Sequence, residues 1–207
     1  MSSIDTFVGE PKNTREAILQ ATHEILCEEG YSGASMSRIA DRVDISKSVL
    51  YHHYDDKDTL LRELLDMTLS ALLEESLRDV EENPVAALRR FLSIPLGIPD
   101  DTQEATAAIS PEFARTYIEL RAQAAHDPQY RENFGKNEAR LRETLVDVVG
   151  RGVEAGDLEA VDPEAAAEYL LTLSQGLIFR RLTTDDVRVD LVREELERYL
   201  GIDLATV

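Results

Sequence analysis

Proline residues mark where four helices of this chain begin. The pairs are Asn83-Pro84, Ser110-Pro111, Asp127-Pro128 and Asp162-Pro163. Asparagine, serine and aspartate accept hydrogen bonds from the first backbone N–H groups of a helix. Proline fits the first helical position because an N–H group there has no intrahelical partner. The stretches between these pairs repeat apolar residues at helical spacing and lack the alternation of a strand, so the sequence predicts an all-α fold.

Nine helices are expected from this periodicity and these start signals. Their predicted ranges are residues 14–29, 36–43, 47–54, 57–82, 84–97, 102–125, 128–155, 163–182 and 187–200. Glycine favours the left-handed backbone that ends a helix. Gly30 is therefore predicted to end the first helix, and Gly156 the seventh helix. Pro111 is expected to bend the sixth.

The chain is predicted to be a cytoplasmic protein without a metal or another cofactor. Its 207 residues are 43% hydrophobic, which suffices for a buried core, yet no run approaches the ~18 apolar residues of a membrane span. The first residues lack the pattern of a signal peptide. Cys27 is the single cysteine, so no intrachain disulfide is expected. His23 lies on the same predicted helix face, but two ligands are too few for a metal site.

Acidic residues dominate the composition. The 41 acidic and 22 basic side chains give a net charge of −19, and four of the basic residues are lysine. Strong acidity argues against DNA binding, because affinity for DNA comes largely from neutralised phosphates. The alternative is adaptation to a salty cytoplasm, and the scarcity of lysine resembles the proteins of halophiles, including halophilic archaea. Residues 12–57 carry a net charge of −2 and the rest carries −17, so this segment is the less acidic part.

The segment from Ser35 to Lys57 has the pattern of a helix-turn-helix followed by the start of a third helix. Four apolar residues fall where two crossed helices and a third would bury them: Ile39, Val43, Ile45 and Leu50. Ser46 is predicted to cap the second helix, whose exposed N-terminal N–H groups favour a phosphate or a base edge. A helix presented in this way fits the major groove of DNA.

The predicted DNA contacts cluster on and around this second helix. Tyr51 and Lys57 are expected to reach phosphates. The full predicted set is Ser35, Ser37, Ser46, Lys47, Ser48, Val49, Tyr51, His52 and Lys57. Without the surrounding motif, His52 would be a solvated surface residue and Tyr51 a core aromatic. Because residues 35–57 have zero net charge, binding is expected to depend on a few placed groups and only weakly on salt.

From about Thr14 to Leu65 the chain resembles the DNA-binding domain of TetR-family regulators. The matching elements are Thr14-Arg15, Ile18-Leu19, Glu29-Gly30-Tyr31, Ser35, Ile39-Ala40, Ile45-Ser46, Leu50-Tyr51-His52-His53-Tyr54, Lys57-Asp58 and Leu60. The resemblance implies a homodimer on a palindromic operator in double-stranded DNA. It also implies a three-helix, helix-turn-helix DNA-binding domain over residues 10–57 and a helical effector-binding and dimerisation domain over residues 58–207.

Two positions depart from the family pattern. Val43-Asp44 stands where the family often has Ala-Gly, and aspartate tolerates the left-handed backbone that such a turn requires. Ser48-Val49 replaces the usual Gly-Thr pair, which changes the chemistry that faces the bases. The operator sequence of other members therefore does not transfer to this chain.

Residues 117–156 resemble the C-terminal domains of betaine- and drug-responsive members of the family. The resemblance implies a small-molecule effector. Its candidate contacts are Met67, Phe113, Tyr117, Arg121, Tyr130, Phe134, Gln175 and Phe179. It also implies that the last two helices form a four-helix bundle with those of a second subunit. The candidate interface residues are Ala166, Leu170, Leu173, Leu177, Leu191 and Leu196. Both sets have an alternative interpretation as core residues of a single chain.

These features favour a ligand-responsive transcriptional regulator, specifically a repressor. An effector would move the helix that begins at Lys57 and change the spacing of the two recognition helices. The alternative within DNA binding is an architectural or effector-independent dimer. An enzyme is disfavoured, because the four histidines form no metal-spaced cluster and the chain has neither a glycine-rich phosphate loop nor a nucleophile motif.

Overall fold

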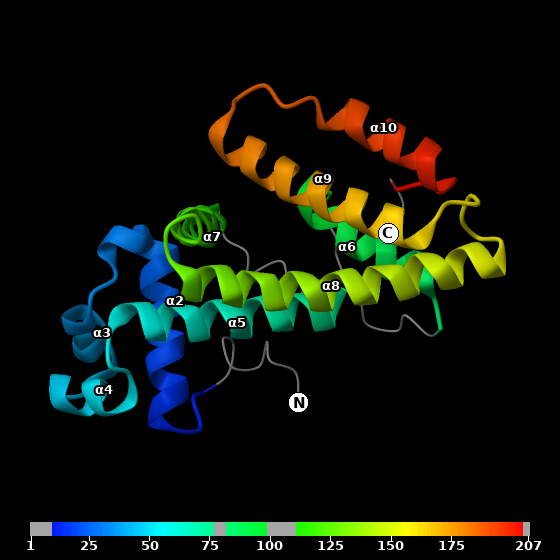
Figure 1. Ribbon diagram of the computed structural model, residues 1–207. Coiled ribbons are helices and arrows are strands. Elements are labelled where there is room, and N and C mark those ends of the chain that lie inside the picture. The colour runs from blue at the N-terminus through cyan, green and yellow to red at the C-terminus, as the bar shows by residue number, and fades with distance from the viewer. Residues whose placement is uncertain (1–9, 77–81, 99–110, 205–207) are drawn as a thin grey trace. The chain divides into compact units, whose positions relative to one another are not determined.

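The computed structural model describes residues 10–76, 82–98 and 111–204 (Figure 1). Within these ranges the chain forms nine α-helices and no strand, as the sequence predicts. The helices are α2 (Thr14–Gly33), α3 (Met36–Val43), α4 (Lys47–His53), α5 (Lys57–Ser76), α6 (Pro84–Leu96), α7 (Pro111–Gln123), α8 (Pro128–Ala155), α9 (Pro163–Thr183) and α10 (Val189–Leu200). None of these helices is both long and apolar enough to cross a membrane.

Side-chain caps begin the helices where the proline pairs predict them. Asn83, Asp127 and Asp162 each accept a hydrogen bond from a backbone N–H of the following first turn, at 2.9, 2.7 and 2.8 Å. Each bond satisfies one of the N–H groups that a helix start leaves without a partner. Helices α6, α8 and α9 then begin at the proline. The fourth predicted cap, Ser110, lies outside the described residues.

Most of the helix bounds agree closely with the prediction, and α3 and α8 have the predicted bounds. Helix α2 differs. Gly30 has a positive φ (71°), as expected of a helix-ending glycine, but it kinks the helix, which continues to Gly33. Helix α7 begins at Pro111. Residues 102–110 of the predicted sixth helix and 77–81 of the predicted fourth lie outside the described residues.

The chain divides into two compact units, and the division falls within α5 and α8. The first unit comprises Met1–Leu72 and Ala107–Asn137. In its core, residues of α2, α3, α4 and α5 pack with residues of α7 and α8. The members from α7 and α8 are Leu120, Tyr130 and Phe134. These later helices thus share a core with the predicted DNA-binding helices. The domain boundary that the resemblance places after residue 57 stays a prediction.

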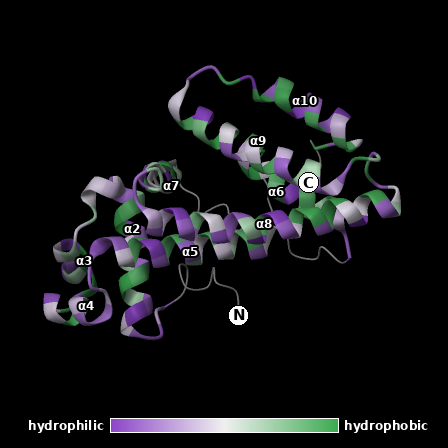
Figure 2. Ribbon diagram, viewed as in Figure 1, coloured by the Kyte–Doolittle hydropathy of each residue, from purple (hydrophilic) through white to green (hydrophobic). Residues whose placement is uncertain are grey.

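The second unit packs α6, the later part of α8, α9 and α10 around an apolar core. Figure 2 shows apolar and polar positions next to one another along these helices. Arg181 of α9 donates hydrogen bonds to two carbonyl oxygens in the last turn of α6, at 3.1 and 3.0 Å. Gly97 follows with φ 66°, and a Cβ atom there would collide with the Arg181 guanidinium. Glycine therefore suits both the backbone and the packing at this helix end.

Asp44 makes the turn between α3 and α4. Its backbone is left-handed (φ 57°, ψ 45°), as predicted, and among the described non-glycine residues it is the one with a positive φ. Its N–H group bonds to carbonyl oxygens of Ala40 and Asp41, which ends α3. Because α4 begins at Lys47, the conformation at Asp44 largely sets the angle between the two helices.

Replacing Asp44 by valine should lower the free energy of unfolding by ~1–2 kcal/mol, because a branched Cβ crowds the next carbonyl oxygen in the left-handed backbone. Replacing it by glycine should leave the stability similar or higher. Urea unfolding followed by circular dichroism measures both variants. Asp55→Val is the matched control, since Asp55 is also an exposed acidic residue next to α4 and does not have a positive φ. Equal losses for the two valine variants would contradict this role of the turn.

Candidate nucleic-acid interface

The short helix α4 is capped at its start by a side chain. Ser46 Oγ accepts a hydrogen bond from the Val49 N–H at 3.3 Å, as predicted. The same oxygen lies 2.8 Å from Ser48 Oγ, so two hydroxyl groups are paired at the helix start. The other first-turn N–H groups have no partner within the helix, and the helix dipole favours an anion near them.

One face of α4 is buried and the opposite face is exposed. Leu50 is fully buried and Tyr54, the C-cap residue, is 2% exposed; both belong to the core of the first unit. Val49 and Tyr51 are 40% and 50% exposed, although both are large hydrophobic side chains. The other exposed residues are Ser46, Lys47, Ser48 and His52. The structure therefore brings the predicted contact residues of α4 together on one open surface.

The predicted contacts on α3 lie at its start. Ser35 is exposed, and its Oγ accepts a hydrogen bond from the Arg38 N–H at 3.3 Å, which makes Ser35 the cap of α3. Ser37, in the first turn, is half-buried. Helix α3 packs against α2 and against α4. Both serines therefore belong to the same helix pair as the open surface of α4.

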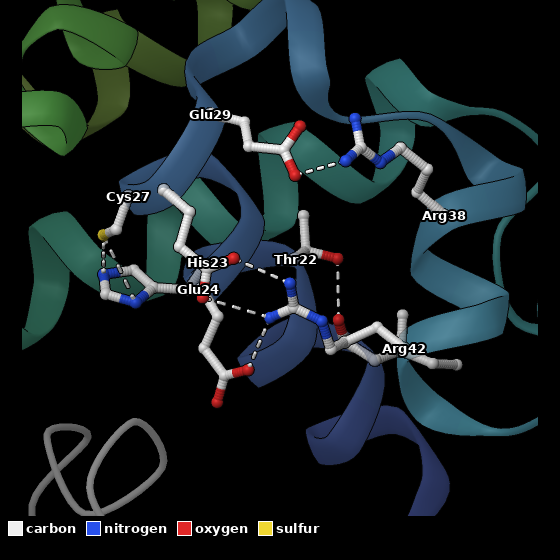
Figure 3. Close-up of polar contacts among 9 residues, drawn as sticks. Thr22, His23, Glu24, Cys27, Glu29, Arg38 and Arg42 are labelled. Carbon is white, nitrogen blue, oxygen red and sulfur yellow. Dashed lines mark hydrogen bonds and ion pairs between the residues drawn. The ribbon is translucent and has the colours of Figure 1, made fainter.

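The arginines of α3 bind carboxylates of α2 (Figure 3). Arg42 donates a hydrogen bond to Glu28 at 2.7 Å. It donates another to Glu24 at 3.2 Å. The hydrogen bond from Arg42 lowers the pKa of the Glu28 carboxyl. Arg38 is paired with Glu29. These three ion pairs connect α3 to α2. The signal in the sequence is the spacing of Glu24 and Glu28, which places their side chains one turn apart on the same side of a helix.

The two lysines predicted to contact DNA have different surroundings. Lys47 is exposed and has no hydrogen-bond or ion-pair partner within the part of the chain that the structure describes. Lys57 is half-buried, and its Nζ donates a hydrogen bond to the Tyr31 carbonyl oxygen at 2.7 Å. The same Nζ lies 3.7 Å from the centroid of the Tyr31 ring. Burial lowers the pKa of Lys57. The sequence does not predict this contact with the end of α2.

Two further contacts hold the start of α5. Asp56 Oδ1 accepts a hydrogen bond from the Thr59 N–H at 2.7 Å, which caps the first turn of α5 and lowers the pKa of the Asp56 carboxyl. Arg15 of α2 donates two hydrogen bonds to Glu63 of α5, at 2.8 and 2.5 Å, and its guanidinium carbon lies 5.3 Å from the centroid of the Tyr54 ring. Arg15 thus connects α2, α4 and α5, a bridge that no local sequence pattern indicates.

Cys27 is a half-buried thiol beside His23 (Figure 3). Its Sγ lies 3.7 Å from Nε2 and 3.9 Å from Nδ1 of the imidazole. Over the described ranges, no group of three or more histidine, cysteine, aspartate and glutamate side chains is placed to hold a metal ion. The pair is a contact between neighbours four residues apart on one helix.

The candidate effector residues are divided between the two units. In the first unit, Tyr117 and Phe134 meet edge to face with their centroids 5.6 Å apart, and the Arg121 guanidinium carbon lies 4.9 Å from the centroid of the Phe134 ring. Tyr130 is buried in the same core, and Met67 packs against it half-buried. These five residues are therefore mainly packing residues of the first unit in this structure.

The other candidates lie elsewhere. Gln175 and Phe179 belong to the second unit, where Gln175 Nε2 donates a hydrogen bond to Glu138 Oε1 at 2.7 Å. Phe179 is 53% exposed. The side chain of Phe113 lies outside the described residues. A separate surface depression of about 580 Å³ is lined by Arg142, Glu143, Val146, Glu164 and Glu168. Four of these five residues are charged, and none of them is a predicted effector contact.

Four of the six predicted interface residues are core residues of their own chain. They are Ala166, Leu170, Leu177 and Leu196, each at most 3% exposed. The second unit covers this side of α9 itself, so these side chains have no surface to offer a partner. Leu173 is half-buried and Leu191 is 50% exposed.

The exposed side of α9 carries aromatic residues instead. Tyr169 is 42% exposed, and its ring meets that of Tyr199 of α10 edge to face, with centroids 5.2 Å apart. Phe179, predicted as an effector contact, is the other exposed aromatic residue of α9. Tyr169, Gly176 and Phe179 recur at the spacing of one helix face, which is the signal that would have identified this side from the sequence.

Known structures share this fold. A TetR transcription regulator from Haloarcula marismortui superposes with a TM-score of 0.73 at 30% identity, covering 90% of this chain and 96% of that one. A putative transcriptional regulator from Saccharomonospora viridis, solved in complex with choline, gives a TM-score of 0.68 at 18% identity, covering 89% and 94%. The second likeness concerns the fold alone.

Sequence relatives agree with the fold. Residues 18–64 match the family described as bacterial regulatory proteins, tetR family, and residues 101–202 match the C-terminal family of BetI-type transcriptional repressors. The HTH-type transcriptional repressor AcnR of Corynebacterium efficiens is 25% identical over 84% of this chain and 85% of its own length. The HTH-type transcriptional regulator BetI of Pseudomonas aeruginosa is 30% identical over 86% of both chains. With this identity over nearly the whole length and both family matches, the chain belongs to the TetR family of transcriptional regulators.

Proposed function

We propose that this protein is a transcriptional repressor that binds a palindromic operator as a homodimer and leaves it when a small-molecule effector binds. Its relatives are named as transcriptional repressors and regulators, which supports this role and gives no support to an enzymatic one. The match of the C-terminal residues to BetI-type repressors supports repression over activation. We infer that the protein acts in the cytoplasm, with the DNA that it regulates.

The open surface of α4 is the observation that carries the proposal. Val49 and Tyr51 are exposed there beside Lys47 and the paired hydroxyl groups of Ser46 and Ser48. Such a surface combines the apolar, hydrogen-bonding and cationic groups that recognise thymine methyl groups, base edges and phosphates. In this proposal Lys47 and Tyr51 contact phosphates, whereas Ser48 and Val49 contact base edges.

The exposed side of α9 and α10 supports the homodimer. In the described chain five large hydrophobic side chains are exposed; two lie on α4, and the others are Tyr169, Phe179 and Leu191. Clusters of exposed apolar residues commonly mark interfaces. Gly176 lies between the two aromatic residues of α9, and beyond its own helix backbone no atom lies within 4 Å of where its Cβ would be. Since its own subunit does not require a glycine there, the small residue suits close approach of a second helix.

The effector of this proposal is a small molecule, and choline is the first compound to test, because a protein of the same fold has been solved with it. The test adds choline, and then fractionated metabolite extracts, to the complex of the protein with a DNA duplex. Release of the duplex supports the proposal. A complex that survives every addition would favour the effector-independent dimer.

Replacing Lys47 by alanine should weaken binding to every duplex by a similar factor, roughly tenfold, because phosphate contacts carry no sequence information. Val49→Ala should instead change the ratio of affinities between a preferred duplex and one with altered half-sites, since a base contact is worth ~1–3 kcal/mol of discrimination. The preferred duplex comes from selection with the wild-type protein from a random-sequence pool, and fluorescence anisotropy measures each affinity.

Lys136→Ala is the control for Lys47→Ala. Lys136 is an exposed lysine of α8 that pairs with Glu132 at 2.7 Å, so its loss should leave DNA affinity unchanged. A Lys47→Ala variant that altered sequence preference alone would show that the phosphate assignment is wrong.

Replacing Phe179 by glutamate should convert the dimer to a monomer, because association would bury a carboxylate without a partner. Sedimentation equilibrium measures the oligomeric state. Val49→Glu makes the same kind of change on α4 and should leave the dimer intact while it abolishes DNA binding. If Phe179→Glu remained dimeric, the interface would have to lie on another surface.

A further inference from the structure

The ammonium group of Lys57 is held between a carbonyl oxygen and an aromatic ring. Its Nζ lies 2.7 Å from the Tyr31 carbonyl oxygen and 3.7 Å from the centroid of the Tyr31 ring. The first distance is that of a hydrogen bond. The second places the cation against the ring, whose face carries negative charge. The ammonium of this half-buried side chain is thus directed into the protein, toward the end of α2.

The Tyr31 carbonyl is an acceptor that needs a donor from elsewhere. It lies in the last turn of α2, after the kink at Gly30. The last four carbonyl groups of a helix have no N–H partner within it, and a cation near them interacts favourably with the helix dipole. Helix α2 has no basic residue in its own last turn. Lys57, which stands 26 residues further along the chain, supplies both the donor and the charge.

The charges around Lys57 disfavour a DNA phosphate. Asp58, the next residue of α5, and Glu119 of α7 both act on the Lys57 ammonium and raise its pKa against the effect of burial. The Tyr130 hydroxyl of α8 donates a hydrogen bond to Asp58 at 3.2 Å. These carboxylates engage the Lys57 charge within its own unit, so less of it is available to a phosphate. The exposed Lys47 carries no such pairing.

A short connection couples the position of α4 to that of α5. The residues between the two helices are Tyr54, Asp55 and Asp56. Tyr54 is buried in the core and Asp56 caps α5, so both ends of the connection are held. A shift of the first turn of α5 relative to α2 would therefore move α4.

We propose that Lys57 is a positioning residue for the recognition helix α4. It fixes the start of α5 to the end of α2 through Tyr31, and it does not contact DNA phosphates. This role replaces the phosphate contact expected of Lys57 from the sequence. It rests on the proposed function, because it concerns how α4 is held for DNA binding.

The salt dependence of DNA binding distinguishes a phosphate contact from a positioning role. The probe is the duplex selected from a random-sequence pool by the wild-type protein. Each neutralised phosphate contributes about 0.9 to the slope of log affinity against log salt concentration. Lys47→Ala should reduce this slope by roughly two in a dimer, which carries two copies of the residue. Lys57→Ala should lower the affinity roughly tenfold at every salt concentration and keep the wild-type slope.

A double-mutant cycle tests whether Lys57 acts through Tyr31. Tyr31→Leu keeps an apolar side chain and removes the ring. If the two residues act together, combining Tyr31→Leu with Lys57→Ala should cost little more affinity than the more harmful single change. Lys57→Arg can still donate to the carbonyl and stack on the ring, so it should restore most of the affinity. Lys57→Met keeps the apolar stem without a donor and should not. Circular dichroism at each salt concentration verifies that every variant is folded.

Several outcomes would overturn this role of Lys57. A loss of slope in Lys57→Ala equal to that in Lys47→Ala would identify a phosphate contact. Unchanged affinity in Lys57→Ala, or fully additive effects in the cycle, would exclude positioning through Tyr31. A wild-type protein that selects no duplex from the pool would contradict the proposed function itself, so the two failures are distinguishable.

Discussion

Helix α4 has seven residues, and a helix of this length is not stable in water by itself. Its conformation and position therefore depend on contacts with the rest of the first unit. Leu50 and Tyr54 anchor its buried face in the core, Asp44 sets its angle to α3, and Ser46 caps its first turn. The residues of the open surface are themselves exposed and do not anchor the helix. The position of that surface therefore depends on these four residues.

The cationic side chains of the first unit mostly bind groups of their own unit, so they contribute little to a general positive field. Arg15, Arg38 and Arg42 each bind a carboxylate of their own unit, and Lys57 binds the end of α2. Exposed ion pairs of this kind contribute little to stability, so they orient the helices more than they stabilise them. Each cation engaged in this way is less available to DNA phosphates. Under the proposed function, affinity for DNA is therefore expected to depend on Lys47, the start of α4 and base contacts. Adaptation to a salty cytoplasm stays a prediction.

Signals that act within one helical turn were readable in the sequence, and contacts between distant segments were not. The left-handed turn at Asp44 follows from the chemistry of that residue alone. A lysine at a helix start, however, has the same pattern whether its ammonium binds a phosphate or the carbonyl of a residue such as Tyr31. Periodicity likewise identifies the apolar positions of α9, but it does not show which of them pack inside their own subunit. Leu170 proved to be buried in its own chain and Phe179 exposed.

The packing of α8 in the first unit bears on how a ligand would act on α4. Tyr130 and Asn137 of α8 donate hydrogen bonds to Asp58 and Asp66 of α5, at 3.2 and 3.0 Å, and these contacts are about two turns apart on each helix. Asp58 is adjacent to Lys57. A ligand that displaced α8 would break the contact with Asp58 and disturb the first turn of α5, and the short connection would transmit this change to α4. Because all of these side chains belong to one compact unit, such coupling would not require the recognition helix to rotate about a hinge between domains.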